Sequence, residues 1–105
     1  MSKIICSIAL MLVCFSTNAQ YLNERELCDF YSEYAKQTME SRQNGGKASN
    51  HIKVLTEFKT LDDDVKKSLE SIVMSAYSRP RYDTPKNKAK AIRDFENDVY
   101  VKCIK

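Results

Sequence analysis

Few side chains of this 105-residue chain have the chemistry of a catalytic or metal site. It holds four cysteines and one histidine, His51, and its densest group of carboxylates is residues 62–64, three successive aspartates. One histidine with distant cysteines does not make a zinc ligand set, and the aspartates lack the alternation and terminal glutamate of a calcium loop. The sequence also holds no CxxC pair, glycine-rich phosphate loop or nucleophile elbow. We therefore expect a protein that is not an enzyme and that uses no metal or cofactor.

The start of the chain has the pattern of a secretory signal. Lys3 precedes an apolar run from Ile4 to Phe15, and polar residues then lead to the small residue Ala19. This run is about twelve residues long, whereas a spanning helix needs roughly twenty. We expect residues 1–19 to be cleaved, which leaves residues 20–105 as a single exported helical domain, periplasmic or secreted. A membrane anchor and a lipid on Cys14 are the weaker alternatives.

Cleavage of the signal would reduce the number of cysteines in the folded domain. Cys6 and Cys14 leave with the signal, so only Cys28 and Cys103 remain in the mature domain. An even number of cysteines in a small exported domain favours a disulfide. On the chain-entropy estimate, closing a loop of this length contributes about 4.5 kcal/mol. We expect Cys28 and Cys103 to be bonded, with two buried free thiols as the alternative.

Composition and charge restrict the class of protein further. The chain has a formal net charge of +3, and the signal contributes only one charged residue, Lys3, so the mature domain carries about +2. This weak charge and the expected export argue against nucleic-acid binding. Only two glycines and two prolines occur in the chain, which argues against disorder and against a sandwich with many turns. We expect an all-α fold, a small antiparallel bundle of three to four helices closed by one disulfide.

Apolar periodicity and capping residues predict the positions of these helices. Asn23, with Glu26 three residues later, predicts a helix that runs to Gln43 and ends at Asn44 and two glycines. Ser49 is the expected cap of a shorter second helix. A third helix is expected to begin near the acidic residues 62–64, whose charge suits a helix N-terminus, and to run to residue 77. Thr84 followed by Pro85 predicts the start of a fourth helix. Its expected apolar face is Ala89, Ile92, Phe95, Val99, Tyr100 and Cys103.

The expected disulfide also predicts where a binding surface lies. If Cys28 and Cys103 are bonded, the first and last helices are antiparallel, and the turns at residues 44–47 and 78–84 share the opposite end of the bundle. Residues 79–93 hold six basic side chains and one acidic one, the only marked charge asymmetry in the chain. The alternative interpretation of this asymmetry is a solvated helix face and a proline turn that bind no partner. The residues we expect to contact a partner are Arg42, Gln43, Arg79, Arg81 and Tyr82.

Three groups of residues give the mature chain a resemblance to known sequences. They are Arg42-Gln43-Asn44-Gly45, then Ala76-Tyr77 with Pro80 and Tyr82, and last Phe95, Asn97, Tyr100 and Cys103. With these marks the chain resembles a group of small exported proteins of bacterial and prophage genomes. The resemblance implies export and the same order of elements, and it implies no activity.

These observations lead to a functional expectation with two alternatives. We expect a non-enzymatic interaction protein with a protein partner in the cell envelope, and an inhibitor of a lytic or phage-encoded enzyme is one form of it. The architecture is also similar to that of periplasmic helical proteins with one disulfide, among them lysozyme inhibitors and acid-stress chaperones. An envelope stress chaperone is therefore the main alternative. A small hydrolase would require His51 to lie beside a carboxylate in a pocket. We expect no stable membrane insertion after cleavage of the signal.

Overall fold

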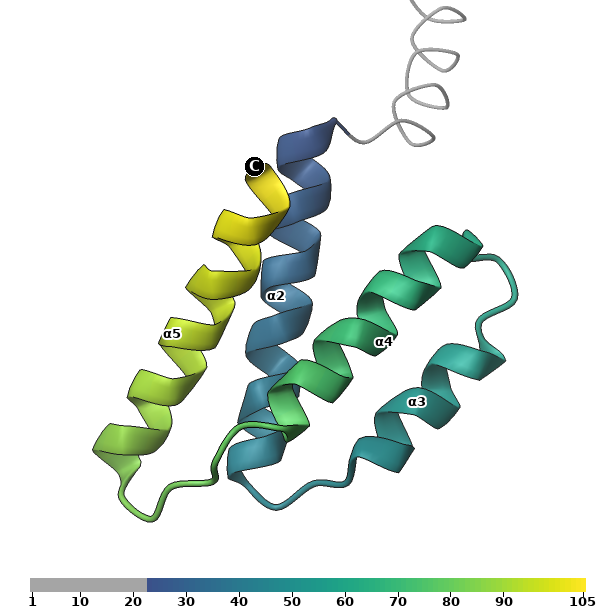
Figure 1. The fold of residues 1–105 in the computed structure, drawn as a ribbon. Helices are drawn as coiled ribbons and strands as arrows, with labels where there is room; N and C mark the ends of the chain where they lie inside the picture. Colours follow the sequence, from purple (N-terminus) through teal and green to yellow (C-terminus); the bar gives the residue numbers. More distant parts are fainter. Residues whose placement is uncertain (1–22) are drawn as a thin grey trace, which may run out of the picture.

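The computed structural model describes residues 23–105 as helices joined by short connections (Figure 1). In chain order they are α2 (Glu24–Gln43), α3 (Ala48–Glu57), α4 (Asp63–Tyr77) and α5 (Pro85–Ile104). The expected all-α fold is confirmed for the described residues. The expected signal at residues 1–19 lies outside the described residues.

Two of the expected helix starts are made by side-chain caps. Asn23 accepts a hydrogen bond from the backbone N–H of Glu26 at 2.8 Å, and Glu26 accepts one in return from the N–H of Asn23 at 3.1 Å. Thr84 accepts a hydrogen bond from the N–H of Asn87 at 3.2 Å, and Pro85 occupies the first helical position. Both helices therefore begin where the sequence predicts, because these side chains satisfy amide groups that have no partner inside the helix.

The start of α3 differs from the expectation. Lys47, not Ser49, occupies the N-cap position, and no side chain makes a capping hydrogen bond there. Ser49 lies inside the first turn and is exposed. The connection from α2 is short, and the chain enters α3 as soon as it has passed Gly46. The expected acidic start of α4 is confirmed, since Asp62 is its N-cap and Asp63 and Asp64 lie in its first turn.

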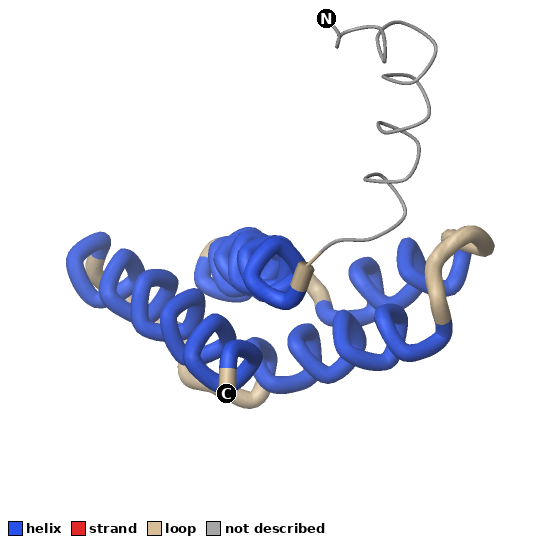
Figure 2. The backbone as a smooth tube through the Cα atoms, turned by 90° about the horizontal axis from the view of Figure 1, so that it is seen from above, coloured by secondary structure: helices blue, strands red, loops and turns tan. Residues whose placement is uncertain are grey.

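The packing of the helices places α2 at the centre of the bundle. It contacts α5 on one side and α4 on the other, while α3 packs on α4. Figure 2 shows this arrangement from above, with α2 between α5 and the α3–α4 hairpin. Phe95 is the largest fully buried side chain, and burying such a ring stabilises the fold by roughly 2–3 kcal/mol. It packs in a core with Ala35, Met39, Leu55, Leu69, Ile72, Val73 and Ala76.

The face of α5 that enters this core is narrower than the sequence predicts. Phe95 is the one residue of α5 that is fully buried, and Ile92, Val99 and Tyr100 are partly buried. Ala89 is exposed. The first turns of α5 lie away from the α3–α4 hairpin in Figure 1, and their neighbours are the end of α2 and the connection at residues 78–84.

The disulfide joins the first turns of α2 to the last turn of α5. Cys28 and Cys103 are bonded, with their Cα atoms 5.5 Å apart, and Cys28 is completely buried. The two helices are therefore antiparallel, and the expected pairing and topology are both confirmed. Among residues 23–105, no helix has the combination of length and apolar character needed to cross a bilayer.

Candidate functional site

The end of the bundle opposite the disulfide is built from residues far apart in the sequence. The last turn of α2 and residues 44–47 meet residues 78–84, the connection between α4 and α5 (Figure 1). We call this end the pole. All five residues predicted to bind a partner, namely Arg42, Gln43, Arg79, Arg81 and Tyr82, lie within it.

Gln43 is the centre of the pole and is completely buried. Its side-chain N–H group donates to the carbonyl of Pro80 at 2.9 Å, and its side-chain oxygen accepts from the backbone N–H of Tyr82 at 2.8 Å. Its backbone carbonyl accepts hydrogen bonds from Arg81 Nε at 3.0 Å and from Lys88 Nζ. Gln43 therefore cannot contact a partner directly in this conformation, and its role is to fix the Pro80–Tyr82 segment.

Arg42 and Arg79 also form contacts within the fold. Arg42 Nε donates to the carbonyl of Arg79 at 3.0 Å, and its guanidinium lies over the ring of Tyr77 at 5.7 Å. The Arg79 guanidinium lies 4.5 Å from the centre of the Phe95 ring and donates to Asp98 at 2.9 Å. This hydrogen bond holds the pKa of Asp98 below its usual value. Both arginines are half-buried, so they connect parts of the bundle as well as adding positive charge.

Arg81 and Tyr82 differ from the other three predicted residues because both are exposed. Tyr82 is 39% exposed, although its backbone amide is held by Gln43. Two small hollows of about 240 and 250 Å³ adjoin its ring, and Ala91 and Asp94 line both of them. Lys90 pairs with Asp94 at 2.6 Å and lowers the pKa of that carboxyl. The side chains of Arg81 and Tyr82 are therefore exposed at the pole, while the hydrogen bonds of Gln43 hold the backbone of this segment in place.

The two glycines allow the turn at the pole to be this tight. Gly45 has a φ of 90°, a region that glycine adopts at no steric cost. At Gly46 a Cβ atom would lie 2.1 Å from the Ser41 hydroxyl oxygen and 3.2 Å from the Tyr77 hydroxyl. Those two hydroxyls are hydrogen-bonded to each other at 3.1 Å. A side chain at residue 46 would therefore displace the Ser41 hydroxyl and disturb its hydrogen bond to Tyr77.

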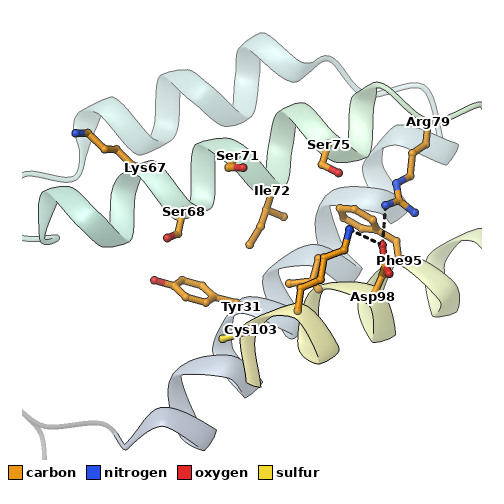
Figure 3. Close-up of a pocket in the computed structure, with 12 residues that line it drawn as sticks. Tyr31, Lys67, Ser68, Ser71, Ile72, Ser75, Arg79, Phe95, Asp98 and Cys103 are labelled. Carbon is orange, nitrogen blue, oxygen red and sulfur yellow. Dashed lines mark hydrogen bonds and ion pairs between the residues drawn. The ribbon is translucent and has the colours of Figure 1, made fainter. Parts of the chain in front are cut away.

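A polar groove runs from the pole between α4 and α5. Its volume is about 490 Å³, and Figure 3 shows Ser68, Ser71 and Ser75 along α4, with Ser68 toward Tyr31 and Cys103 and Ser75 toward the ion pair of Arg79 and Asp98. Ile72 and Phe95 lie between the helices. Lys102 completes the charged group, since its ammonium lies 3.4 Å from the Asp98 carboxylate. The apolar periodicity of the sequence could not predict this groove, because the groove depends on how α4 and α5 pack beside α2.

A second, apolar groove of about 520 Å³ lies between α2 and the α3–α4 hairpin. Phe30, Val54 and Phe58 line it, and each is roughly half exposed. Tyr34 is also in its wall, and burial raises the pKa of this phenol. Exposed apolar side chains that gather in one groove are typical of binding sites rather than of ordinary protein surface.

The structure gives no catalytic arrangement to His51. Its ring lies 5.7 Å from the Tyr77 ring, in the wall of the apolar groove, where no carboxylate is among the lining residues. Among residues 23–105 no three side chains of the metal-binding types are grouped closely enough to hold a metal ion. Comparison of the sequence with known protein families, with curated proteins and with solved structures finds no significant match.

Proposed function

We propose that residues 20–105 form an exported, non-enzymatic interaction domain that binds a protein partner of the cell envelope through the pole. The observation that carries the proposal is the burial of Gln43 beneath Arg81 and Tyr82. A surface fixed before binding loses less conformational entropy when a partner arrives. Tyrosine and arginine are also the residue types that contribute most to protein interfaces.

The charge of the pole supports a partner with an acidic surface. Arg81 adds to the half-buried Arg42 and Arg79, Lys86 and Lys88 lie next to the pole in the first turn of α5, and Asp83 is the acidic residue of the connecting segment. Charge complementarity of this kind speeds association and selects among partners. The disulfide supports an oxidising compartment, as expected for an exported protein. Inhibition of a lytic or phage-encoded enzyme is the form of this activity that we favour.

Photo-crosslinking in cells that produce the full chain tests the proposal even while the partner is unidentified. A benzophenone amino acid in place of Tyr82 should give a covalent adduct with one protein, identified by mass spectrometry. The same amino acid in place of Met74, which is 61% exposed on α4, is the matched control. Adducts of equal yield at both positions, or no adduct at residue 82, would contradict the proposal.

The apolar groove favours a second candidate function, that of a stress chaperone. Phe30, Val54 and Phe58 could hold an apolar segment of an unfolded client, and a chaperone of this class should expose more apolar surface under acid. The fluorescence of an apolar dye, measured from neutral pH to about pH 3, reports that exposure. A chaperone predicts a rise in fluorescence that Phe58→Ser reduces. Constant fluorescence over this range would remove the second candidate.

A further inference from the structure

The polar groove between α4 and α5 carries an excess of positive charge. Three of its lining side chains, Lys67, Arg79 and Lys102, are cationic, and Asp98 is the acidic one. Asp98 lies within 4 Å of both Arg79 and Lys102, so a single carboxylate is shared by two cations. Within residues 23–105, Lys67 takes part in no ion pair. This charge balance favours an anionic ligand over a cationic one.

Hydrogen-bonding groups follow the same groove in a regular row. Ser68, Ser71 and Ser75 are three or four residues apart on α4, so their hydroxyls share one face of the helix, as Figure 3 shows. Tyr31 adds a phenol from α2. Hydroxyl groups can donate to carboxylate oxygens, and hydrogen bonds to ionised groups are about twice as strong as neutral ones.

The floor of the groove is apolar, and this indicates what kind of anion would fit. Ile72, Phe95 and Val99 line it between the two polar walls. A phosphate polymer has no apolar groups to place there, whereas a polypeptide can alternate acidic and apolar side chains. The row from Ser68 to Ser75 spans about 10 Å at the rise of an α-helix, which matches about three residues of extended chain or two helical turns.

We infer that this groove is the binding site for an acidic, amphipathic polypeptide segment of the partner. The inference rests on the proposed function, because the groove begins at Arg79, which is part of the pole. The carboxylates of the segment would lie along the serine hydroxyls of α4 and beside Lys102, while Lys67, whose side chain points outward in Figure 3, would add positive charge at the edge of the groove. Its apolar side chains would cover Ile72 and Val99.

A synthetic peptide can replace the unidentified partner in the test. The probe is a fluorescein-labelled peptide of sequence ELEELEEL, and its counterpart KLKKLKKL has the opposite charge. Binding to the oxidised protein is measured by fluorescence anisotropy at about 20 mM salt, where screening is weak. We expect binding of the acidic peptide only. Equal binding of both peptides, no binding of the acidic one, or its displacement by inorganic polyphosphate at equal charge would overturn the inference.

Charge reversal inside and outside the groove locates the site. Lys67→Glu with Lys102→Glu should weaken binding of the acidic peptide at least about tenfold, or about 1.4 kcal/mol. Lys53→Glu with Lys59→Glu removes the same charge from exposed positions on and after α3, and affinity should stay within about twofold. Equal losses of affinity in both double variants would show that the peptide is attracted by net charge alone, and would overturn the proposed site. Ser71→Glu, at an exposed position in the groove, provides the same test if the double variant does not fold.

The proposed peptide site in the groove and the proposed binding surface at the pole can be tested separately. Arg81→Ala should leave the affinity for the acidic peptide unchanged, because Arg81 does not line the groove. In ¹⁵N NMR spectra the peptide should shift the amide signals of Ser71 and Ser75 more than that of Val54, in the apolar groove. Peptide shifts centred on Val54 would overturn the groove site. The crosslink at Tyr82 tests the pole independently of this result.

Discussion

Gln43 is a polar side chain at a position where a helical bundle usually buries an apolar one. Burying an amide without hydrogen bonds costs several kcal/mol, but here both its side-chain nitrogen and its oxygen are paired with the Pro80–Tyr82 segment. In residues 23–105 no buried side-chain nitrogen or oxygen lacks a partner. The interaction also restricts the conformation of the segment, because both ends of the amide must be satisfied at once.

Replacement of Gln43 should therefore destabilise the fold more than that of a surface glutamine. We expect Gln43→Ala to lower the free energy of unfolding by about 2–4 kcal/mol, since it leaves the Tyr82 N–H and the Pro80 carbonyl unpaired and opens a cavity. Gln37→Ala, on an exposed face of the same helix, should change it by less than about 0.5 kcal/mol. Urea denaturation measures both values, and similar losses would contradict the role of Gln43.

Asp98 should make part of the stability depend on pH. Its pKa is lowered mainly by the hydrogen bond from Arg79, with Lys102 adding to the effect. A group whose pKa is lower in the folded state stabilises the fold above its unfolded pKa of about 4, and this contribution disappears as pH falls through the folded pKa. The side chain is 40% exposed, so solvent screening limits the contribution to at most about 1 kcal/mol.

The variant Asp98→Asn isolates this contribution. At pH 7 it should unfold at a lower urea concentration than the wild type, by at most about 1 kcal/mol. As pH falls from 7 toward 2 the difference between the two proteins should shrink, because protonation of the carboxyl removes its charge from the wild type. A difference that stays constant from pH 7 to pH 2 would show that Asp98 acts through packing rather than charge.

At the scale of the elements, local sequence signals predict helix boundaries well where a side chain caps the helix. Asn23 with Glu26, and Thr84 with Pro85, act through contacts at most three residues long, which a sequence displays directly. Ser49 carries the same kind of signal and does not cap, because the turn after Gly46 brings the chain into α3 earlier. The start of α3 is therefore set by the short connection after Gly46 and not by the capping signal of Ser49.

This difference between true and apparent caps can be measured. Asn23→Ala should lower the stability by about 1 kcal/mol, because the N–H of Glu26 loses its acceptor. Ser49→Ala should have no effect or stabilise slightly, since alanine favours a helix interior and no capping bond is lost. Thermal unfolding followed by circular dichroism provides both values. An equal loss at Ser49 would mean that it caps α3 in solution.

The candidate site could be predicted only in part. The disulfide and the antiparallel order of the first and last helices placed the five predicted residues at one end of the bundle, as observed. The burial of Gln43 could not be predicted, because its partners lie 37 and 39 residues away in the chain. Both grooves were missed for a similar reason. They arise between helices whose relative positions no periodic pattern specifies.

At the scale of the whole molecule, the two ends of the bundle are closed by different means. The disulfide holds α2 to α5 at one end, and the hydrogen bonds of Gln43, Arg42 and Arg81 close the other end. The core between them is small, with Phe95 the largest of its fully buried side chains. A domain of this size has limited stability from burial alone, so both closures matter.

Loss of the disulfide should therefore have a large effect. Cys28→Ser with Cys103→Ser should lower the free energy of unfolding by about 2–5 kcal/mol, since the unfolded chain is no longer restricted by the long loop. The variant should remain helical at low temperature and melt at a lower temperature than the oxidised wild type. Circular dichroism with and without a reducing agent measures both. An unchanged melting temperature would show that packing alone holds α2 against α5.

The central claim is that Gln43 fixes the pole as a preformed surface, and hydrogen exchange of the Tyr82 amide tests it most directly. This amide lies outside any helix and donates to the buried side-chain oxygen of Gln43 at 2.8 Å. We expect it to exchange slowly in the wild type and to exchange rapidly in Gln43→Ala, at temperatures where both proteins are folded. Rapid exchange of the Tyr82 amide in the wild type would contradict the claim.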